Sequence, residues 1–174
     1  MSERTCKGLI QVYTGDGKGK TTAALGLAMR AAGQGMKVAF IQFLKTEACG
    51  EHMFLSCHKS FDIIQSEGGR IFTKSSERLA QEARKTLDHA EGKMLSGKYE
   101  LLVLDEIFMA IHKGLISSEQ VAGLLDKKPD TVELVLTGRN APVELLKRAD
   151  LVTEMRMIKH PFKRGIAARR GIEY

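Results

Sequence analysis

A glycine- and lysine-rich stretch near the start of the chain decides the predicted fold: Thr14-Gly15-Asp16-Gly17-Lys18-Gly19-Lys20-Thr21-Thr22. It follows the apolar run 9–13, which predicts a buried strand, and precedes residues 23–30, which predict a helix. A strand, a glycine loop ending in Gly-Lys-Thr and a helix together are typical of a phosphate-binding loop. The glycines let backbone N–H groups turn toward an anion, and the helix N-terminus adds partial positive charge.

The stretch departs at one position from the usual pattern, G-x-x-x-x-G-K-[ST]. Counting back from Gly19, Thr14 stands where the first glycine is usual, and Gly15 follows one place later. We still expect a bound triphosphate, along a path that can differ from that of a motor ATPase. A glycine-rich structural turn is one alternative. A dinucleotide fingerprint is the other, although Lys20 stands where its third glycine would be.

Length, composition and charge narrow the class of protein. With 174 residues, 43% of them hydrophobic and 28% charged, we expect a single domain over residues 1–174 that ends in a basic tail or lid, 157–174. No apolar run approaches the ~20 residues of a membrane span, and the start has no apolar signal region, so we expect a cytoplasmic protein without a membrane partner. The net charge of +6 fits a polyanionic ligand. Because no nucleic-acid recognition module is visible, a nucleotide is preferred over nucleic acid.

The three cysteines do not suggest a disulfide framework. Cys49, His52, Cys57 and His58 cluster in the sequence, but the adjacent Cys57 and His58 can hardly both reach one ion, and no C-x-x-C pair exists. Ordinary thiols are therefore preferred over a zinc site.

Strand-like and helix-like segments alternate along the chain. After the first strand, further strands are predicted at 37–43, 61–65, 99–104, 131–136 and 150–155. Helices are predicted from an N-cap at Ser76 to Gly97, at 107–111, from Ser117 or Ser118 to 125, and at 143–149, while 44–60 is expected to be irregular. This alternation predicts an α/β fold of the P-loop NTPase class, with a mainly parallel sheet of about six strands covered by helices on both faces.

The apolar run 101–104 ends in Asp105 and Glu106, which is the acidic strand end that partners a phosphate loop. Placed beside the first strand, it would point a carboxylate at Mg²⁺ held by Thr21 and the phosphates. The predicted metal ligands are therefore Thr21, Glu106 and Asp105, and exposed acids at a strand end are the alternative.

Two basic side chains lie where strands end. Arg139 follows the strand at 131–136 and could bind phosphate or substrate, although a surface salt bridge is also open. Lys45 follows the second strand and is equally well read as a phosphate ligand or a solvated lysine. The predicted nucleotide-binding residues are Gly15, Asp16, Gly17, Lys18, Gly19, Lys20, Thr21, Thr22 and Lys45.

The residues alone indicate an Mg²⁺-dependent nucleoside-triphosphate protein. A signalling GTPase would carry an N-K-x-D-type guanine reader after a late strand, whereas this chain has Thr-Gly-Arg-Asn at 137–140. A water-splitting ATPase with Glu106 as base and a small-molecule kinase with the tail as lid both remain open.

Seven motifs in order resemble the ATP:cob(I)alamin adenosyltransferases of the BtuR/CobO type, over nearly the whole chain. They are Gly-Asp-Gly-Lys-Gly-Lys-Thr-Thr-Ala-Ala (15–24), Gln-Phe-Leu-Lys (42–45), Val-Leu-Asp-Glu (103–106), Leu-Thr-Gly-Arg (136–139), Ala-Asp-Leu-Val-Thr-Glu (149–154), Lys-His-Pro-Phe (159–162) and Gly-Ile-Glu-Tyr (171–174). The resemblance implies a RecA-like sheet, a homodimer, ATP, Mg²⁺ (or Mn²⁺), a corrinoid substrate and a flavoprotein reductase as electron source.

The reaction implied by this resemblance is attack of cob(I)alamin on C5′ of ATP, after which the whole triphosphate leaves. The protein then needs no nucleophile of its own and must position the reactants and neutralise the leaving group. The catalytic residues expected on this basis are Lys20, Thr21, Glu106 and Arg139, with ATP reversed in the loop. Phe72 is expected to contact the corrinoid, because the family places Phe and Trp in this segment and the chain has no Trp. A P-loop ATPase or kinase with another substrate is the alternative.

Overall fold

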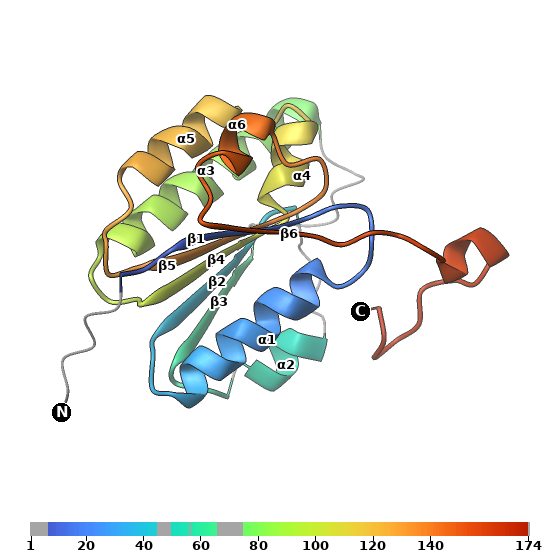
Figure 1. Cartoon of the computed structure of the whole chain (residues 1–174), viewed down its shortest axis with the longest axis horizontal. Coiled ribbons are helices and arrows are strands. Elements are labelled where there is room, and N and C mark those ends of the chain that lie inside the picture. The colour runs from blue at the N-terminus through green and yellow to red at the C-terminus, as the bar shows by residue number, and fades with distance from the viewer. Residues whose placement is uncertain (1–6, 45–49, 56, 66–74, 174) are drawn as a thin grey trace.

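The computed structural model describes residues 7–44, 50–55, 57–65 and 75–173 (Figure 1). Within these residues six strands form one sheet in which every pairing is parallel. The strands are β1 (Ile10–Thr14), β2 (Val38–Gln42), β3 (Phe61–Gln65), β4 (Leu101–Asp105), β5 (Glu133–Thr137) and β6 (Leu151–Glu154). The predicted α/β class and its parallel sheet are confirmed.

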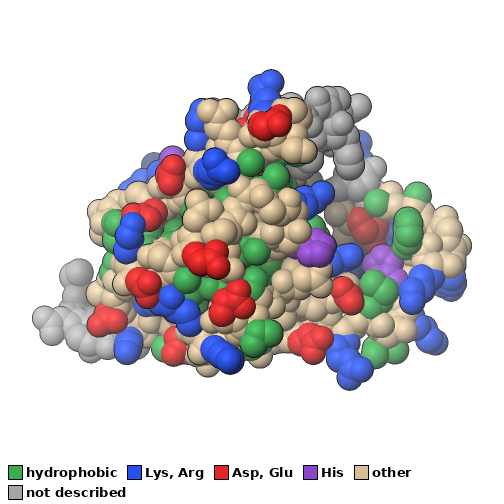
Figure 2. Space-filling view, turned by 90° about the horizontal axis from the view of Figure 1, so that it is seen from above, with side chains coloured by type: hydrophobic (Ala, Val, Ile, Leu, Met, Phe, Trp, Pro, Cys, Tyr) green, Lys and Arg blue, Asp and Glu red, His purple; other side chains and the backbone are tan. Residues whose placement is uncertain are grey.

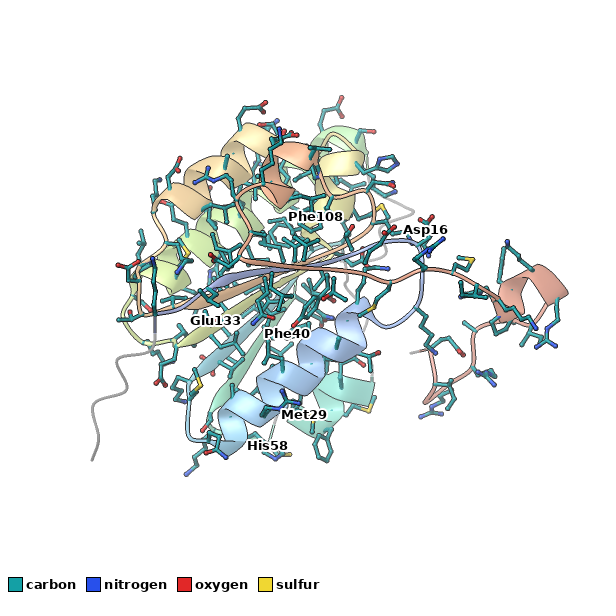
Figure 3. The ribbon with its side chains drawn as sticks, in the orientation of Figure 1. Asp16, Met29, Phe40, His58, Phe108 and Glu133 are labelled. Atoms are coloured by element: carbon teal, nitrogen blue, oxygen red, sulfur yellow. The ribbon has the colours of Figure 1, made fainter. Side chains whose placement is uncertain are left out.

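Helices cover both faces of the sheet (Figure 1). On one face lie α1 (Lys20–Gly33) and α2 (Gly50–Leu55). On the other lie α3 (Ser76–Leu95), α4 (Ile107–His112), α5 (Ser118–Asp126) and α6 (Val143–Leu146). Two apolar clusters fill the layers, one around Phe40 and one around Phe108, and Figure 3 shows these rings on opposite sides of the sheet. Because both faces are covered, the inner strands read as continuous apolar runs.

The strand order is β3-β2-β4-β5-β1-β6. The prediction that β4 lies beside β1 is wrong, because β5 pairs with both and separates them. All three strands still end at the same edge, since a parallel sheet brings its carboxyl ends together. In Figure 3 Asp16 marks this edge and Glu133 lies at the opposite one.

Two local predictions also need correction. Residues 44–60 are expected to be irregular, yet Gly50–Leu55 forms α2. This helix has only six residues, of which Leu55 alone is buried, so no helical period is visible in its sequence. The N-cap of α3 is Ser75 rather than Ser76, and its hydroxyl accepts a hydrogen bond from the Arg78 N–H at 3.4 Å.

The basic tail leaves β6, forms the short 3₁₀ helix η2 (Pro161–Arg164) and returns toward the start of α1 (Figure 1). Figure 2 shows Lys and Arg side chains together with apolar ones at this end of the molecule. The described part of the tail folds back to the phosphate loop, and its role as a lid stays a prediction. No helix among the described residues has the length and apolar character needed to cross a membrane.

Gly138 shapes the turn by which β5 leaves the sheet. Its φ is +139°, and a Cβ there would lie 2.9 Å from the Cβ of Phe108 in α4. We predict that Gly138→Ala lowers the free energy of unfolding by about 1–3 kcal/mol, because it adds backbone strain and a clash. Chemical denaturation measures this loss.

Gly92→Ala is the matched control. Gly92 lies inside α3 with open space around it, so alanine should stabilise by about 0.5–1 kcal/mol through helix propensity. Equal effects of the two substitutions would contradict the role given to the Gly138 turn.

Candidate nucleotide-binding site

The loop between β1 and α1 wraps around the Lys20 ammonium. Lys20 is the first residue of α1 and is 6% exposed, and its Nζ donates to the carbonyl oxygens of Gly15 at 2.7 Å and Gly17 at 2.8 Å. Burial lowers the pKa of Lys20 from its ordinary value, while the nearby Glu106 carboxylate opposes that shift. The loop therefore holds a positive charge at the helix N-terminus, where an anion is favoured.

The segment after β6 explains why residues 15 and 17 are glycines. The Gly17 N–H donates to the Met155 carbonyl oxygen at 2.6 Å. A Cβ on Gly15 would lie 2.5 Å from that oxygen, and one on Gly17 would lie 2.7 Å from it. Gly15 also has a φ of +92°. The shifted glycine position of this loop thus matches a close backbone contact with the segment that follows β6.

The Asp105 carboxylate lies at the centre of a hydrogen-bonded group. It is 1% exposed, and its Oδ1 accepts from the hydroxyls of Thr21 at 2.9 Å and Thr137 at 2.7 Å. Its Oδ2 accepts from Gln42 Nε2 at 3.1 Å. The carboxylate thereby joins α1, β2, β4 and β5 at one point.

Glu106 follows in a left-handed conformation with a φ of +59°, and its N–H donates to Thr137 Oγ1 at 3.0 Å. Glu106 and the exposed Arg139 both line a cavity of about 540 Å³ in front of the loop. Its full lining is Gly17, Lys18, Gly19, Lys20, Thr21, Thr22, Leu25, Gly50, Glu51, Glu106, Arg139, His160, Gly171, Ile172 and Glu173.

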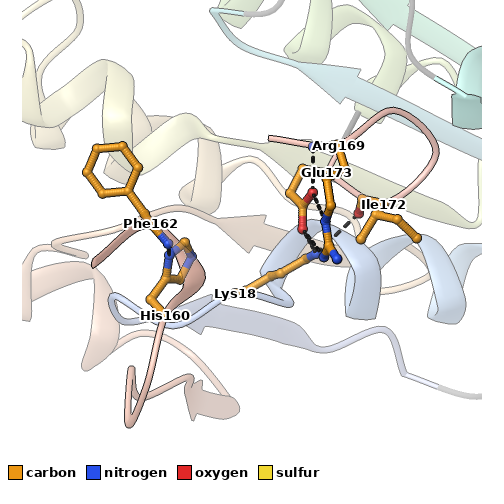
Figure 4. Close-up of polar contacts among 6 residues, drawn as sticks. All are labelled: Lys18, His160, Phe162, Arg169, Ile172 and Glu173. Carbon is orange, nitrogen blue, oxygen red and sulfur yellow. Dashed lines mark hydrogen bonds and ion pairs between the residues drawn. The ribbon is translucent and has the colours of Figure 1, made fainter. Parts of the chain in front are cut away.

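The end of the C-terminal tail lines this cavity, and its polar contacts with Lys18 are drawn in Figure 4. Lys18 Nζ donates to Glu173 Oε1 at 3.0 Å and to the Ile172 carbonyl oxygen at 3.2 Å. Arg169 donates to Glu173 from its backbone N–H and from its guanidinium. These hydrogen bonds, above all those from Arg169, lower the pKa of Glu173 to about 2, so its carboxylate is ionised at neutral pH.

The sequence of this chain matches known proteins over nearly its whole length. Residues 6–174 match the family described as ATP:corrinoid adenosyltransferase BtuR/CobO/CobP. The chain belongs to this family. A corrinoid adenosyltransferase of Sinorhizobium is 40% identical over 97% of this chain and 81% of its own length. Those of Escherichia coli and Salmonella typhimurium are 35% and 34% identical over 97% of this chain and 86% of their own lengths.

Most of the site residues predicted from the sequence meet at this cavity. Six of the nine predicted nucleotide-binding residues line it, together with Glu106 and Arg139. Asp105 lies behind Thr21, whereas Gly15 and Asp16 lie outside the lining. Lys45 and Phe72 fall outside the described residues, so their predicted roles stay predictions.

The described residues contain no group of three or more His, Cys, Asp and Glu side chains able to hold a metal ion. Cys57 is an exposed free thiol, and Cys49 lies outside the described part. A site built from Thr21, Asp105 and phosphate oxygens does not need such a cluster.

Sequence reasoning gave no separate role to Gln42 and Thr137. Each is a polar residue that follows an apolar run at the carboxyl end of its strand, and each hydrogen-bonds Asp105. A polar side chain at the end of a doubly covered strand is the signal that would have found them, because a buried polar group needs a partner.

Thr137→Val tests the Asp105 group with a substitution of nearly the same shape. We predict a loss of about 1–3 kcal/mol in the free energy of unfolding, because Asp105 loses a donor and the Glu106 N–H loses its acceptor. Denaturant titration measures this change. Thr153→Val on the exposed edge strand β6 is the control and should stay within about 0.5 kcal/mol. A comparable loss in both variants would argue against a special role for Thr137.

Proposed function

We propose that the β1–α1 loop holds the triphosphate of ATP as a leaving group while the 5′-deoxyadenosyl group passes to a reduced corrinoid. The observation that carries this proposal is the cavity in front of the loop, which Lys20, Thr21 and Arg139 all line, in a chain of the ATP:corrinoid adenosyltransferase family. The relatives from Sinorhizobium, Escherichia coli and Salmonella typhimurium that match 97% of the chain are corrinoid adenosyltransferases.

The reaction forms a cobalt–carbon bond and breaks the bond between C5′ and its oxygen. The Co(I) centre of the corrinoid substrate supplies the electron pair of the new bond, and inorganic triphosphate leaves with the electron pair of the broken C5′–O bond. No side-chain nucleophile is needed. The work of the protein is to orient C5′ toward cobalt and to stabilise the charge that develops on the departing oxygen. Lys20 and Arg139 are the positive side chains placed to do so.

The residues around Thr21 fit a bound Mg²⁺ or Mn²⁺. The Thr21 hydroxyl and the Asp105 carboxylate are 2.9 Å apart, and hydroxyl, carboxylate and phosphate oxygens are the donors that these ions take. Glu106 supplies a second carboxylate on the cavity wall. When bound, the ion would neutralise charge on the triphosphate. Thr21 and Glu106, with Asp105 behind them, are the ligands we assign.

Several further features belong to the same proposal. ATP enters the loop in reverse, because the reacting carbon must face outward rather than the γ-phosphate. The protein works as a cytoplasmic homodimer that receives reduced corrinoid through a flavoprotein reductase, and Phe72 contacts the corrinoid. These features rest on the family resemblance. The position of the loop supports only the proposed binding of the triphosphate.

The released product tests the proposed reaction. Incubated with ATP, Mg²⁺ and a chemically reduced corrinoid, the protein should release intact triphosphate and give the absorption spectrum of a light-sensitive alkyl-cobalt product. Chromatography of the phosphates and spectroscopy of the corrinoid measure both. Corrinoid-independent release of ADP and phosphate without a spectral change would point to an ATPase or kinase instead.

Lys20→Ala in the same assay should lower kcat/KM by about 10²–10³-fold, the usual effect of removing one group that stabilises transition-state charge. Lys147→Ala, which removes an exposed lysine at the end of α6, should leave it unchanged. Full activity of Lys20→Ala would contradict the assignment of the loop.

The proposal extends to the tail as a lid. Glu173 holds Lys18 on one side and Arg169 on the other, and residues 171–173 line the nucleotide cavity. The tail would therefore cover the bound triphosphate and restrict its exchange with solvent.

Trypsin cleavage after Arg169 and Arg170 measures how firmly the lid is held. Glu173→Gln should speed cleavage about two- to fivefold, the range expected for an exposed ion pair. The pKa of Glu173 is lowered from 4.5 to about 2. The stabilisation of the folded-back tail by the Glu173 ion pairs is therefore complete above pH 4.5 and is lost only as the pH falls through about 2. The effect should thus be constant over the working range of trypsin. Glu144→Gln is the control, and cleavage unaffected by ATP would contradict a lid.

A further inference from the structure

A line of hydrogen bonds connects α2 to the proposed metal site. His52 Nε2 lies 2.5 Å from Gln42 Oε1, and Gln42 Nε2 donates to Asp105 Oδ2 at 3.1 Å. The other oxygen of the same carboxylate accepts from Thr21. The line therefore runs from a histidine on a short helix, through a buried amide and a buried carboxylate, to the hydroxyl at the start of α1.

The chemistry of the groups fixes the direction of every donor. An ionised carboxylate only accepts, so the group that Gln42 presents to Asp105 is its NH₂. The carbonyl oxygen of the same amide then faces His52, and the imidazole must carry a hydrogen on Nε2. Both the neutral Nε2–H tautomer and the imidazolium meet this requirement. The hydrogen bond from His52 thus persists whether or not the ring is protonated.

His52 also belongs to the helix that borders the nucleotide cavity. Gly50 and Glu51 begin α2 and line that cavity, and His52 follows one residue later. Gln42 and Asp105 are each 1% exposed, which leaves water little access to either group. A hydrogen bond in such a place is stronger than in water, and removal of one partner has a larger effect.

We propose that His52 is a positioning residue for the metal–triphosphate site. Its Nε2–H orients the Gln42 amide, and this amide sets the plane of the Asp105 carboxylate and hence the place of the Thr21 hydroxyl. Groups that orient a metal ligand from behind tune the affinity of the site without touching the ion. The proposal rests on the metal role given above to Thr21 and Asp105.

Manganese binding tests this role without any corrinoid. With ATP present, electron paramagnetic resonance of free Mn²⁺ gives the affinity of the site. His52→Phe keeps an aromatic ring but removes the donor, and should weaken Mn²⁺ binding about tenfold, the lower end of the range for residues behind a metal ligand. His52→Gln offers an amide N–H at a similar reach and should restore most of the affinity. His58→Phe, at an exposed turn after α2, is the matched control and should bind Mn²⁺ like wild type.

Asp105→Asn separates failure of this proposal from failure of the metal site. If Asp105→Asn weakens Mn²⁺ binding while His52→Phe does not, the positioning role is wrong and the metal site stands. If Asp105→Asn binds Mn²⁺ as well as wild type does, the metal site is wrong and the role of His52 falls with it. Equal weakening by His52→Phe and His52→Gln would also overturn the proposal, because an N–H donor at this position would then not restore Mn²⁺ affinity.

The wild-type protein offers a test that does not depend on the folding of a variant. Nitrogen-15 NMR of labelled histidines reports which ring nitrogen of His52 carries hydrogen, with the His52→Gln spectrum as the assignment. Protonated Nε2 supports the proposed line of donors. Unprotonated Nε2 overturns it.

Discussion

The arrangement of the site depends on the hydrogen bonds that the buried Asp105 carboxylate accepts. Asp105 is almost inaccessible to solvent, and a charge in such a position is costly unless several donors meet it. Thr21, Thr137 and Gln42 supply those donors from α1, β5 and β2. The requirement is mutual, because each of these polar side chains also needs a partner at the end of an apolar strand or at the start of a helix. The hydrogen bonds to the Asp105 carboxylate therefore fix the relative positions of the elements that surround the phosphate loop.

Local sequence patterns were enough to predict the positions of the strands and of the phosphate loop, but not the order of the strands in the sheet. An apolar run of five residues between turns predicts a doubly covered strand because burial on both faces removes the alternation of polar and apolar residues. The same uniformity hides which strands are neighbours: the faces of β4 and β5 are both lined by Leu and Val. The position of β5 between β1 and β4 follows from packing of the whole sheet. The helix α2 was missed for a related reason, since six residues with one buried side chain carry no readable period.

At the site, the sequence predicted the residue types that carry charge and missed those that orient them. Lys20, Thr21, Asp105 and Glu106 stand in a recognisable spacing because their chemistry requires it. Gln42 and Thr137 each hydrogen-bond the Asp105 carboxylate, and these contacts join residues 63 and 32 positions apart. The off-pattern Gly15 has the same kind of explanation. Its lack of a side chain is explained by the Met155 carbonyl, which approaches from the segment after β6, about 140 residues later in the chain.

The charges around the cavity explain why a divalent ion belongs to the proposed reaction. Its lining contains the three cations Lys18, Lys20 and Arg139 and the three carboxylates Glu51, Glu106 and Glu173, which balance one another. Among the described residues, the side chains that line the cavity therefore give no excess positive charge to set against a triphosphate, although the protein as a whole carries +6. The N–H groups at the start of α1 supply part of the difference. A cation bound at Thr21 would supply the rest, at the point where Asp105 already holds the hydroxyl in place. In the proposed reaction, stabilisation of the triphosphate would thus depend on the positions of Thr21 and Asp105 rather than on a large basic surface.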